Sequence, residues 1–374
     1  MITLPRTTPR LSGRPSRPET GPIGLALAEE AVHVAQLSRR RGKLKMRGLA
    51  TLPYPESREA LLAAPRELKR LVRAALRAHG LTGGPIATVL PPEEVKLISV
   101  NYTVRPGQGE GAALAQVVGE RLGGDLAEYV VDFVPVRDND HAGGERTALV
   151  AVAKEAVVIP YLEAFRRAGL KVAALEIGPV AIRRLVSVLR PEGDFSNVLV
   201  INFVRIKSYL TVLSGRRLLF DREIAFGEER LLHRLTEALN LAPASAAALI
   251  RQHGLAPNGK SGNGEKGDLD VATTLVEILK PAFLECVDAI QQILIYTLSE
   301  THGRSVEQIY LLGSIARWPG ADRLLNSLVE MAVSNLDPVT PFATDAGRGE
   351  PDAAGHPQAA IAVGLALRGM VDDA

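Results

Sequence analysis

The side chains that most often carry out catalysis are present in this sequence, but their spacing does not form a recognisable site. No Gly-x-Ser-x-Gly or similar nucleophile motif occurs. The seven histidines are scattered and lack the spacing of metal ligands. They are His33, His79, His141, His233, His253, His302 and His356. We therefore expect neither a nucleophilic catalytic site nor a metal centre.

The single cysteine, Cys286, lies in a helical pattern between Leu284 and Val287. A lone cysteine cannot form an intramolecular disulfide, and free cysteines are usually buried and unreactive. This pattern favours a reducing compartment.

The composition is that of a globular protein with room for two domains. The chain has 374 residues, of which 46% are hydrophobic and only 4% are aromatic. So few aromatic residues disfavour surfaces on which bases stack. The net charge of +2 argues neither for nor against nucleic-acid binding. We therefore expect no nucleic-acid partner. Because no apolar stretch approaches the roughly 20 residues of a membrane span and no signal-peptide core is present, we expect a cytoplasmic protein.

The segment around which the chain is organised is Asn197–Gly227. Three apolar runs, Val198–Val204, Ser208–Leu213 and Arg217–Ile224, predict neighbouring strands, and Ser214–Gly215 predicts the turn between the last two. An amphipathic helix follows, because leucines recur after this segment at helical spacing on one face.

The same order occurs near the N-terminus. Strands are predicted over Ile23–Leu27, Ala31–Leu37 and Leu44–Leu52, and a helix over about Arg66–His79. This helix has an apolar face and a basic stripe opposite, which we expect to be a solvated surface. Two halves with the same order predict two related domains that face one another.

The remaining segments set the domain boundaries. Glu93–Leu170 alternates strands and helices outside the repeated scheme, which predicts an inserted α+β subdomain. Proline and arginine dominate the first 22 residues, which predicts a disordered basic arm. The full division is 1–22 as the arm, 23–92 and 171–190 as the first domain, 93–170 as the insert, 195–356 as the second domain, and 357–370 as a closing helix that packs back on the first domain.

Several segments, taken in order, resemble the PilM and FtsA branch of the actin-like proteins. IYLLGSIARWPGADRLLNSL resembles the adenosine motif, and REIAFGEERLLHRL resembles the turn after the second-half hairpin. EAFRRAGLKVAALEIGPVAIRRL resembles the link between the inserted subdomain and the first domain, and PQAAIAVGLALRG resembles the closing helix. Together, nearly everything after residue 22 resembles the PilM-like proteins of type IV pilus assembly.

This resemblance implies an α/β, actin-like two-domain fold, built from two ribonuclease-H-like halves with an inserted 1C-type subdomain. It implies a scaffold at the inner face of the inner membrane, peripheral to the membrane through its partner and working with other pilus platform proteins. PilM-like proteins bind the cytoplasmic N-terminal peptide of a PilN-like inner-membrane protein, in a groove between the first domain and the insert. They also bind ATP in the cleft between the domains.

The nucleotide chemistry of this family can be compared residue by residue in the first half. In this family, two strand turns hold the phosphates. Each turn needs a carboxylate to place hydrated Mg²⁺. Each also needs small residues, so that backbone N–H groups can approach the phosphate oxygens. The family pattern IGIDIGSSSVKAVQL corresponds here to IGLALAEEAVHVAQL. The aspartate, the glycine, two serines and the lysine are replaced by Ala26, Ala28, Glu29, Glu30 and His33, respectively.

The second half has lost the same features. The family's DIGA corresponds to Asn202–Arg205, so that asparagine replaces the aspartate and Val204 stands where backbone should approach phosphate. Arg205 and Lys207 offer charge for an anion, but without metal geometry. The cofactor-binding candidates that the comparison leaves are Asn202, Gly227, Gly313 and Ser314, and no residue is expected to hold a metal.

These replacements predict that ATP hydrolysis is absent and that ATP binding is weak or lost, so neither ATP nor Mg²⁺ is expected as a cofactor. If the alignment slips by one or two residues, Asp221 or Glu176 is the nearest substitute carboxylate. The leading expectation is thus a PilM-like scaffold. The alternatives are an active ATPase of the same family, an FtsA-like membrane-associated filament protein, and the cytoplasmic part of a GspL-type secretion protein.

Overall fold

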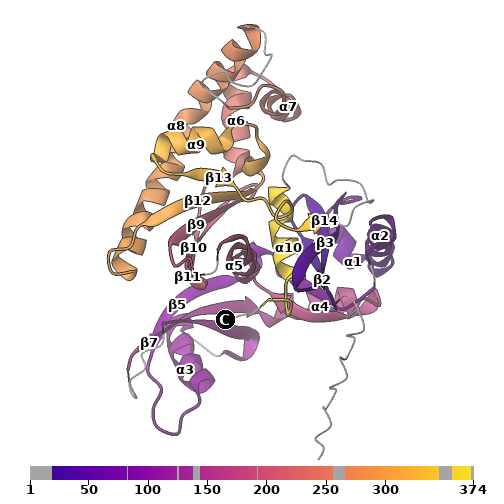
Figure 1. Ribbon diagram of the computed structural model, residues 1–374, viewed down its shortest axis with the longest axis vertical. Helices are drawn as coiled ribbons and strands as arrows, with labels where there is room; N and C mark the ends of the chain where they lie inside the picture. The colour runs from indigo at the N-terminus through magenta and orange to yellow at the C-terminus, as the bar shows by residue number, and fades with distance from the viewer. Residues whose placement is uncertain are drawn as a thin grey trace, which may run out of the picture.

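The computed structural model describes residues 19–81, 83–123, 126–137, 144–191, 193–255, 266–344 and 356–371. These residues form two α/β halves, each around its own sheet, and a smaller third sheet (Figure 1). The predicted arm, as far as residue 18, lies outside the described residues. Among the described helices, none combines the length and the apolar character needed to cross a bilayer.

The first half has the predicted order of three antiparallel strands followed by helices. Its six-stranded sheet has the order β14-β3-β2-β1-β4-β8. The elements contributed in sequence are β1 (Glu19–Leu27), β2 (Ala31–Arg40), β3 (Lys43–Pro53), α1 (Arg58–Ala63), α2 (Pro65–Ala78), β4 (Ile86–Val89) and β8 (Val172–Glu176).

Strand β1 begins earlier than the sequence predicted, so the arm was drawn too long. Thr20 already pairs with Ser38, and the register then shifts at a bulge before Ile23. Pro22 lies within this bulge, where a missing backbone N–H leaves no ladder hydrogen bond unmade. The side-chain amide of Gln36 donates to the carbonyl of Gly21 at 3.1 Å, which fixes the bulge to β2.

The second half repeats this order around a five-stranded sheet, β11-β10-β9-β12-β13. The three predicted strands and the helix after Gly227 are confirmed. The elements are β9 (Asn197–Phe203), β10 (Ser208–Ser214), β11 (Arg217–Ile224), α6 (Glu228–Leu239), α7 (Pro243–His253), α8 (Lys266–Glu300), β12 (Val306–Gly313), α9 (Ala321–Val329) and β13 (Val333–Asn335).

The inserted sheet has the order β5-β7-β6 and carries α3 (Glu110–Leu122) on one face. Its strands are β5 (Lys96–Tyr102), β6 (Tyr129–Arg137) and β7 (Arg146–Lys154). The insert is smaller than predicted, because α4 (Glu155–Arg167) belongs to the core of the first half. Tyr161 and Phe165 of α4 are buried there against Leu68 and Val72 of α2. Sequence order places α4 after β7, but its apolar face decides where it packs.

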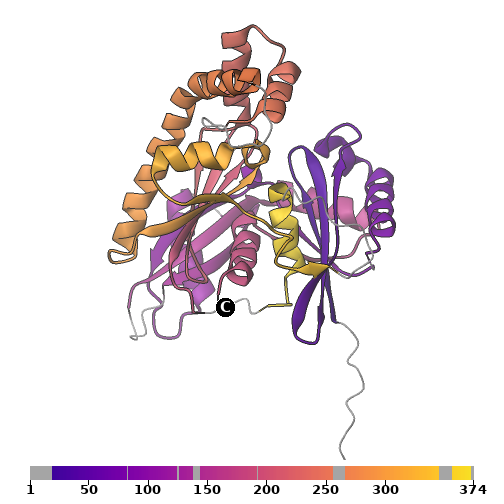
Figure 2. The ribbon, with the colours of Figure 1, turned by 45° about the horizontal axis from the view of Figure 1, so that its top comes forward.

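One hydrophobic core joins the two halves around α5 (Gly178–Leu189) and α10 (Ala360–Ala366). In Figure 2, α10 (yellow) lies between the two halves. Helix α10 packs against the first half, and it ends at Ala366. The short strand β14 (Ala343–Thr344) pairs with β3, so the chain has already returned to the first sheet before residue 356. The predicted end of the second domain is therefore too late.

Two glycines let α10 enter this core. A Cβ added to Gly24 of β1 would lie 1.9 Å from the carbonyl oxygen of Ala362. A Cβ added to Gly364 would lie 2.1 Å from the carbonyl oxygen of Ala181 in α5. Because backbone lies on both sides, neither contact can be relieved by a side-chain rotation.

We predict that Gly24→Ala lowers the free energy of unfolding by about 2 kcal/mol or more, since the added methyl group overpacks the contact between β1 and α10. Gly111→Ala in α3 is the matched control, because nothing lies within 4 Å of the added atom. Urea unfolding of both variants gives the comparison. Equal midpoints for the two variants would contradict this packing.

Candidate functional site

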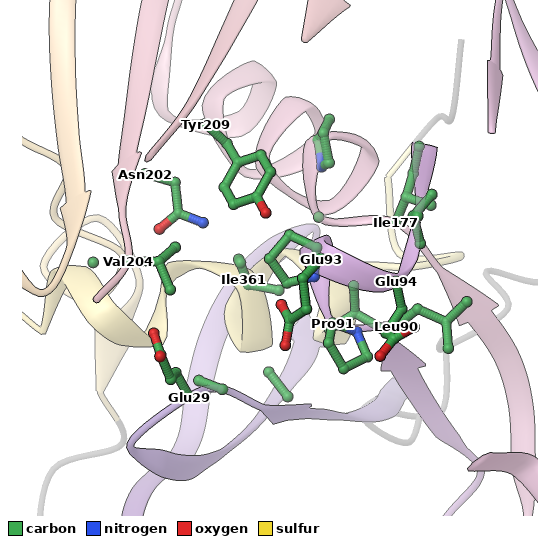
Figure 3. A pocket seen from close by; sticks show the side chains of 18 of the residues that line it. Glu29, Leu90, Pro91, Glu93, Glu94, Ile177, Asn202, Val204, Tyr209 and Ile361 are labelled. Atoms are coloured by element: carbon green, nitrogen blue, oxygen red, sulfur yellow. The ribbon is translucent and has the colours of Figure 1, made fainter. Parts of the chain in front are cut away.

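A cleft of about 1010 Å³ lies between the two halves and continues towards the inserted sheet. The turn between β1 and β2 forms one wall, and the turn between β9 and β10 faces it. Figure 3 shows Asn202, Val204 and Tyr209 on one side of this cleft and Glu29 on the other. This is the place where the resemblance predicted a nucleotide.

Three of the four predicted cofactor-binding residues, Asn202, Gly313 and Ser314, line the cleft. Their hydrogen-bonding groups are partly used within the protein. The backbone N–H of Ser314 donates to the carbonyl of Phe203 at 2.8 Å, and its hydroxyl donates to the same oxygen at 3.3 Å. Gly313 has a φ of +86°, and a Cβ there would lie 2.0 Å from that oxygen. The glycine is needed for packing between strands β12 and β9.

The fourth residue, Gly227, does not line the cleft but lies behind its wall. A Cβ at this position would lie 2.5 Å from the carbonyl oxygen of Arg205. Its role is to let the start of α6 approach the β9–β10 turn. There the N–H of Glu228 donates to the carbonyl of Val204 at 3.1 Å, and that of Glu229 to Arg205 at 2.8 Å. These first helical N–H groups, which often bind phosphate, already have partners.

The two facing turns are joined by the carboxylate of Glu29. Its Oε2 accepts the backbone N–H of Arg205 at 2.9 Å, and its Oε1 accepts Nε–H of the same residue at 2.9 Å. Arg205 also pairs with Glu229 at 3.0 Å. The backbone donor that would meet a phosphate oxygen in this fold is thus bound to a carboxylate from the opposite half.

A second bridge crosses the cleft beside the first. Arg317, which follows β12, pairs with Glu30 at 2.7 Å. Glu228 lies 4.0 Å from the same guanidinium and accepts the indole N–H of Trp318 at 3.0 Å. Burial and the nearby Glu30 carboxylate raise the pKa of Glu228 to about 7. This wall of the cleft already holds excess acidic groups, so it disfavours a further anion.

His33, which stands where the family has a lysine, does not restore a positive charge. Its Nδ1 lies 3.0 Å from the hydroxyl of Thr51, and the side chain is buried in the cleft wall. Burial, together with the positive charge of Arg317, lowers the pKa of His33 to about 4. The imidazole is therefore neutral at physiological pH.

Neither substitute carboxylate is placed to hold Mg²⁺. Asp221 lines the cleft, but it lies in the middle of β11 and accepts the hydroxyl of Thr211 at 2.5 Å. Burial raises its pKa to about 6, which weakens it as a metal ligand. Glu176 is the last residue of β8, but it is buried and forms a bidentate pair with Arg184 at 2.9 and 3.1 Å.

The residues present do not fit Mg²⁺·ATP. No cluster of potential metal-ligating side chains occurs in the described part of the chain. A phosphate oxygen about 4 Å from Glu29 would meet a like-charge repulsion of about 4 kcal/mol at an effective dielectric near 20, before screening. The two arginines nearest the facing turns, Arg205 and Arg317, are already paired with carboxylates of the protein.

A second groove, of about 580 Å³, runs between α1 and α4. Its floor is apolar and its rims carry charges of both signs. Pro91, Glu94 and Val157 line both this groove and the cleft, so the two adjoin. Ile159, which is 49% exposed, presents an unusually open aliphatic side chain here. The remaining lining residues include Arg58, Glu59, Leu62, Ala63, Pro65, Ala164 and Arg167.

Residues 24–370 match the family described as "Type IV pilus assembly protein PilM". The chain belongs to this family. Its fold is similar to that in a solved PilM-PilN type IV pilus biogenesis complex, with a TM-score of 0.76 and 22% identity over 94% of this chain and 99% of that chain. The suspected family and the actin-like fold class are therefore confirmed.

Weaker similarity extends to other proteins. The ethanolamine utilization protein EutJ from Carboxydothermus hydrogenoformans aligns with a TM-score of 0.49 and 13% identity, over 95% of this chain and 91% of that one. MreB 5 of Spiroplasma citri bound to AMPPNP aligns with a TM-score of 0.45 and 10% identity, over 86% and 91%.

Sequence reasoning identified the altered turns but missed the bridges between them. The signal was present as opposite charges, Glu29 and Glu30 on one predicted turn and Arg205 on the other. Arg317 could not be included, because its position depends on how β12 ends beside β9. The groove between α1 and α4 was missed because α4 was assigned to the insert.

The pH dependence of stability tests the state of Asp221. Between about pH 4 and pH 6 the folded chain retains a proton that an unfolded aspartate releases, so the free energy of unfolding falls as pH rises. Asp221→Asn keeps an oxygen acceptor but cannot ionise. We therefore predict that it gains stability relative to the wild type across this range and keeps that gain at higher pH.

Urea midpoints measured at several pH values give this comparison, with the exposed Asp132→Asn as the control. The control should follow the wild-type curve. If the Asp221→Asn curve also runs parallel to the wild type, the carboxyl is ionised in the folded state and is available as a ligand.

Proposed function

We propose that the chain is a nucleotide-independent scaffold of type IV pilus assembly, which docks the cytoplasmic N-terminal peptide of a PilN-like inner-membrane protein. Membership of the PilM family and similarity to the PilM-PilN complex support such a partner. The Glu29–Arg205 contact is the observation that supports independence from nucleotide. The chain would then act at the inner face of the inner membrane, held there through its partner and alongside other platform proteins.

We infer that the peptide docks in the groove between α1 and α4. It lies where the first half meets the end of the insert, and Leu62, Ile159 and Ala164 supply apolar surface. An extended peptide rises by about 3.3 Å per residue and places alternate side chains on one side, so apolar anchors two residues apart can enter such a groove.

Charged groups at the rim are arranged to orient the peptide. Arg58 pairs with Glu93 at 2.5 Å and with Glu59 at 3.1 Å, so its guanidinium is held at the edge of the groove. Glu94 also lines the groove and has an exposed side chain. A peptide with apolar anchors and a basic residue would complement the apolar floor and this carboxylate.

Ile159→Glu tests this site, because it places a charge on the apolar floor without disturbing the core. We predict that affinity for a synthetic PilN-type peptide falls about tenfold or more, as expected for a buried anchor position. Fluorescence anisotropy with a labelled peptide from the PilN-type protein encoded alongside this chain gives the measurement.

Ile295→Glu is the matched control. Ile295 is 71% exposed on α8, in the other half of the molecule, so its replacement should leave peptide affinity unchanged. Equal losses in the two variants, or no loss with Ile159→Glu, would reject this groove as the docking site.

A further inference from the structure

Helix α2 presents a strongly basic surface on the outer side of the first half, away from the second half (Figure 1). Leu68, Val72 and Ala75 face the core and are fully buried. The opposite side carries arginines at helical spacing, and all of them are exposed: Arg66, Arg70, Arg73 and Arg77. One glutamate accompanies them on the helix, and it pairs with Arg70 at 2.6 Å.

The end of α4 extends this basic surface. A methyl group on Gly169, just after α4, would lie 3.7 Å from Nζ of Lys69, so the two helices meet here. Arg166, Arg167 and Lys171 are exposed beside this junction. We define the basic face as Arg66, Lys69, Arg70, Arg73, Arg77, Arg166, Arg167 and Lys171.

Much of this charge is not neutralised by the protein. Glu163 pairs with Arg166 at 2.6 Å and lies 3.6 Å from Arg167. Within the described part of the chain, Arg66, Arg73 and Arg77 make no ion pair. Residues 1–18 cannot neutralise them either, because that segment contains four arginines and no acidic residue.

We propose that the basic face binds the anionic surface of a phospholipid bilayer. Its charges are spread over two neighbouring helices rather than gathered in a pocket, which suits a planar anionic surface. The eight residues that define the basic face include no aromatic one, so they do not supply the stacking groups of single-strand nucleic-acid sites. Arg167 belongs both to the basic face and to the groove between α1 and α4. A peptide leaving the membrane would therefore enter the groove next to the bilayer.

Only this last orientation rests on the proposed function; lipid binding can be measured without any peptide. The experiment is co-sedimentation of the full chain with vesicles of phosphatidylcholine alone, or with phosphatidylglycerol added. The wild type should sediment with the anionic vesicles only, and less of it as salt is raised, because screening weakens surface charge interactions. Arg66→Glu/Arg73→Glu/Arg77→Glu should lower the bound fraction about tenfold or more.

The matched control is Arg216→Glu/Arg217→Glu/Arg222→Glu, which makes the same change in net charge at exposed positions around β11. It should bind anionic vesicles like the wild type. Both triple variants should keep the wild-type midpoint of urea unfolding, which shows that they are folded and keeps this test independent of the test of the groove.

Three results would overturn the proposal. The first is that the wild type does not sediment with anionic vesicles. The second is that it sediments equally with neutral ones. The third is that both triple variants lose vesicle binding equally. Retention on polyglutamate or on double-stranded DNA without vesicle binding would assign the basic face to an acidic macromolecule instead.

Discussion

Two strand turns from opposite halves of the chain meet through the carboxylate of Glu29, and this contact occupies two donors of Arg205 at the cleft. The side chains of Glu29 and Arg205 remain 30% and 51% exposed, so the ion pair itself adds less than about 1 kcal/mol to stability. Its importance is chemical. The backbone donor of Arg205 and its guanidinium are occupied at the point where an actin-like protein would hold phosphate.

The relative position of the two halves depends on other contacts. Residues from both sheets, such as Val198 and Ala35, share one core with α5 and α10. Beneath it, Arg184 donates to Glu176 and to the carbonyl of Gly364, and Arg368 pairs with the same glutamate. Removing one partner of a buried pair typically costs about 3–5 kcal/mol, because the other charge stays uncompensated. These contacts therefore hold the C-terminal segment against α5 and β8, and they involve no ligand.

Local patterns predicted most of the secondary structure, since the period of the apolar residues in β9, β10 and α6 follows from which face each element buries. The expected fold class was correct because two halves showed the same order. Packing between elements far apart in the chain was harder to predict from the sequence. The placement of α4 in the first half depends on Tyr161 and Phe165 meeting α2, and the sequence contains no local signal for that contact. Pro22 suggested an irregular arm, although a bulge accommodates it within β1.

In the candidate site, too, some features could be predicted from the sequence and others could not. Losses such as Ala26 and Val204 could be recognised from the sequence, because the chemistry of a phosphate turn requires particular residue types. The packing role of Gly227 and the burial of Glu176 could not, because both depend on elements far away in the chain. A glycine that matches a motif can be retained for close backbone approach alone, as the 2.5 Å distance from its added Cβ to the Arg205 carbonyl illustrates.

The most direct test of this account is calorimetric titration of the purified chain with ATP and Mg²⁺ up to millimolar concentration. Hydrogen–deuterium exchange of the β9–β10 turn should be followed in the same samples. If the Glu29 bridge excludes phosphate, no saturable binding and no change in exchange at Arg205 are expected. Saturable binding, accompanied by slower exchange in the turns, would mean that the Glu29 bridge opens to admit phosphate and that the chain is a nucleotide-dependent adaptor.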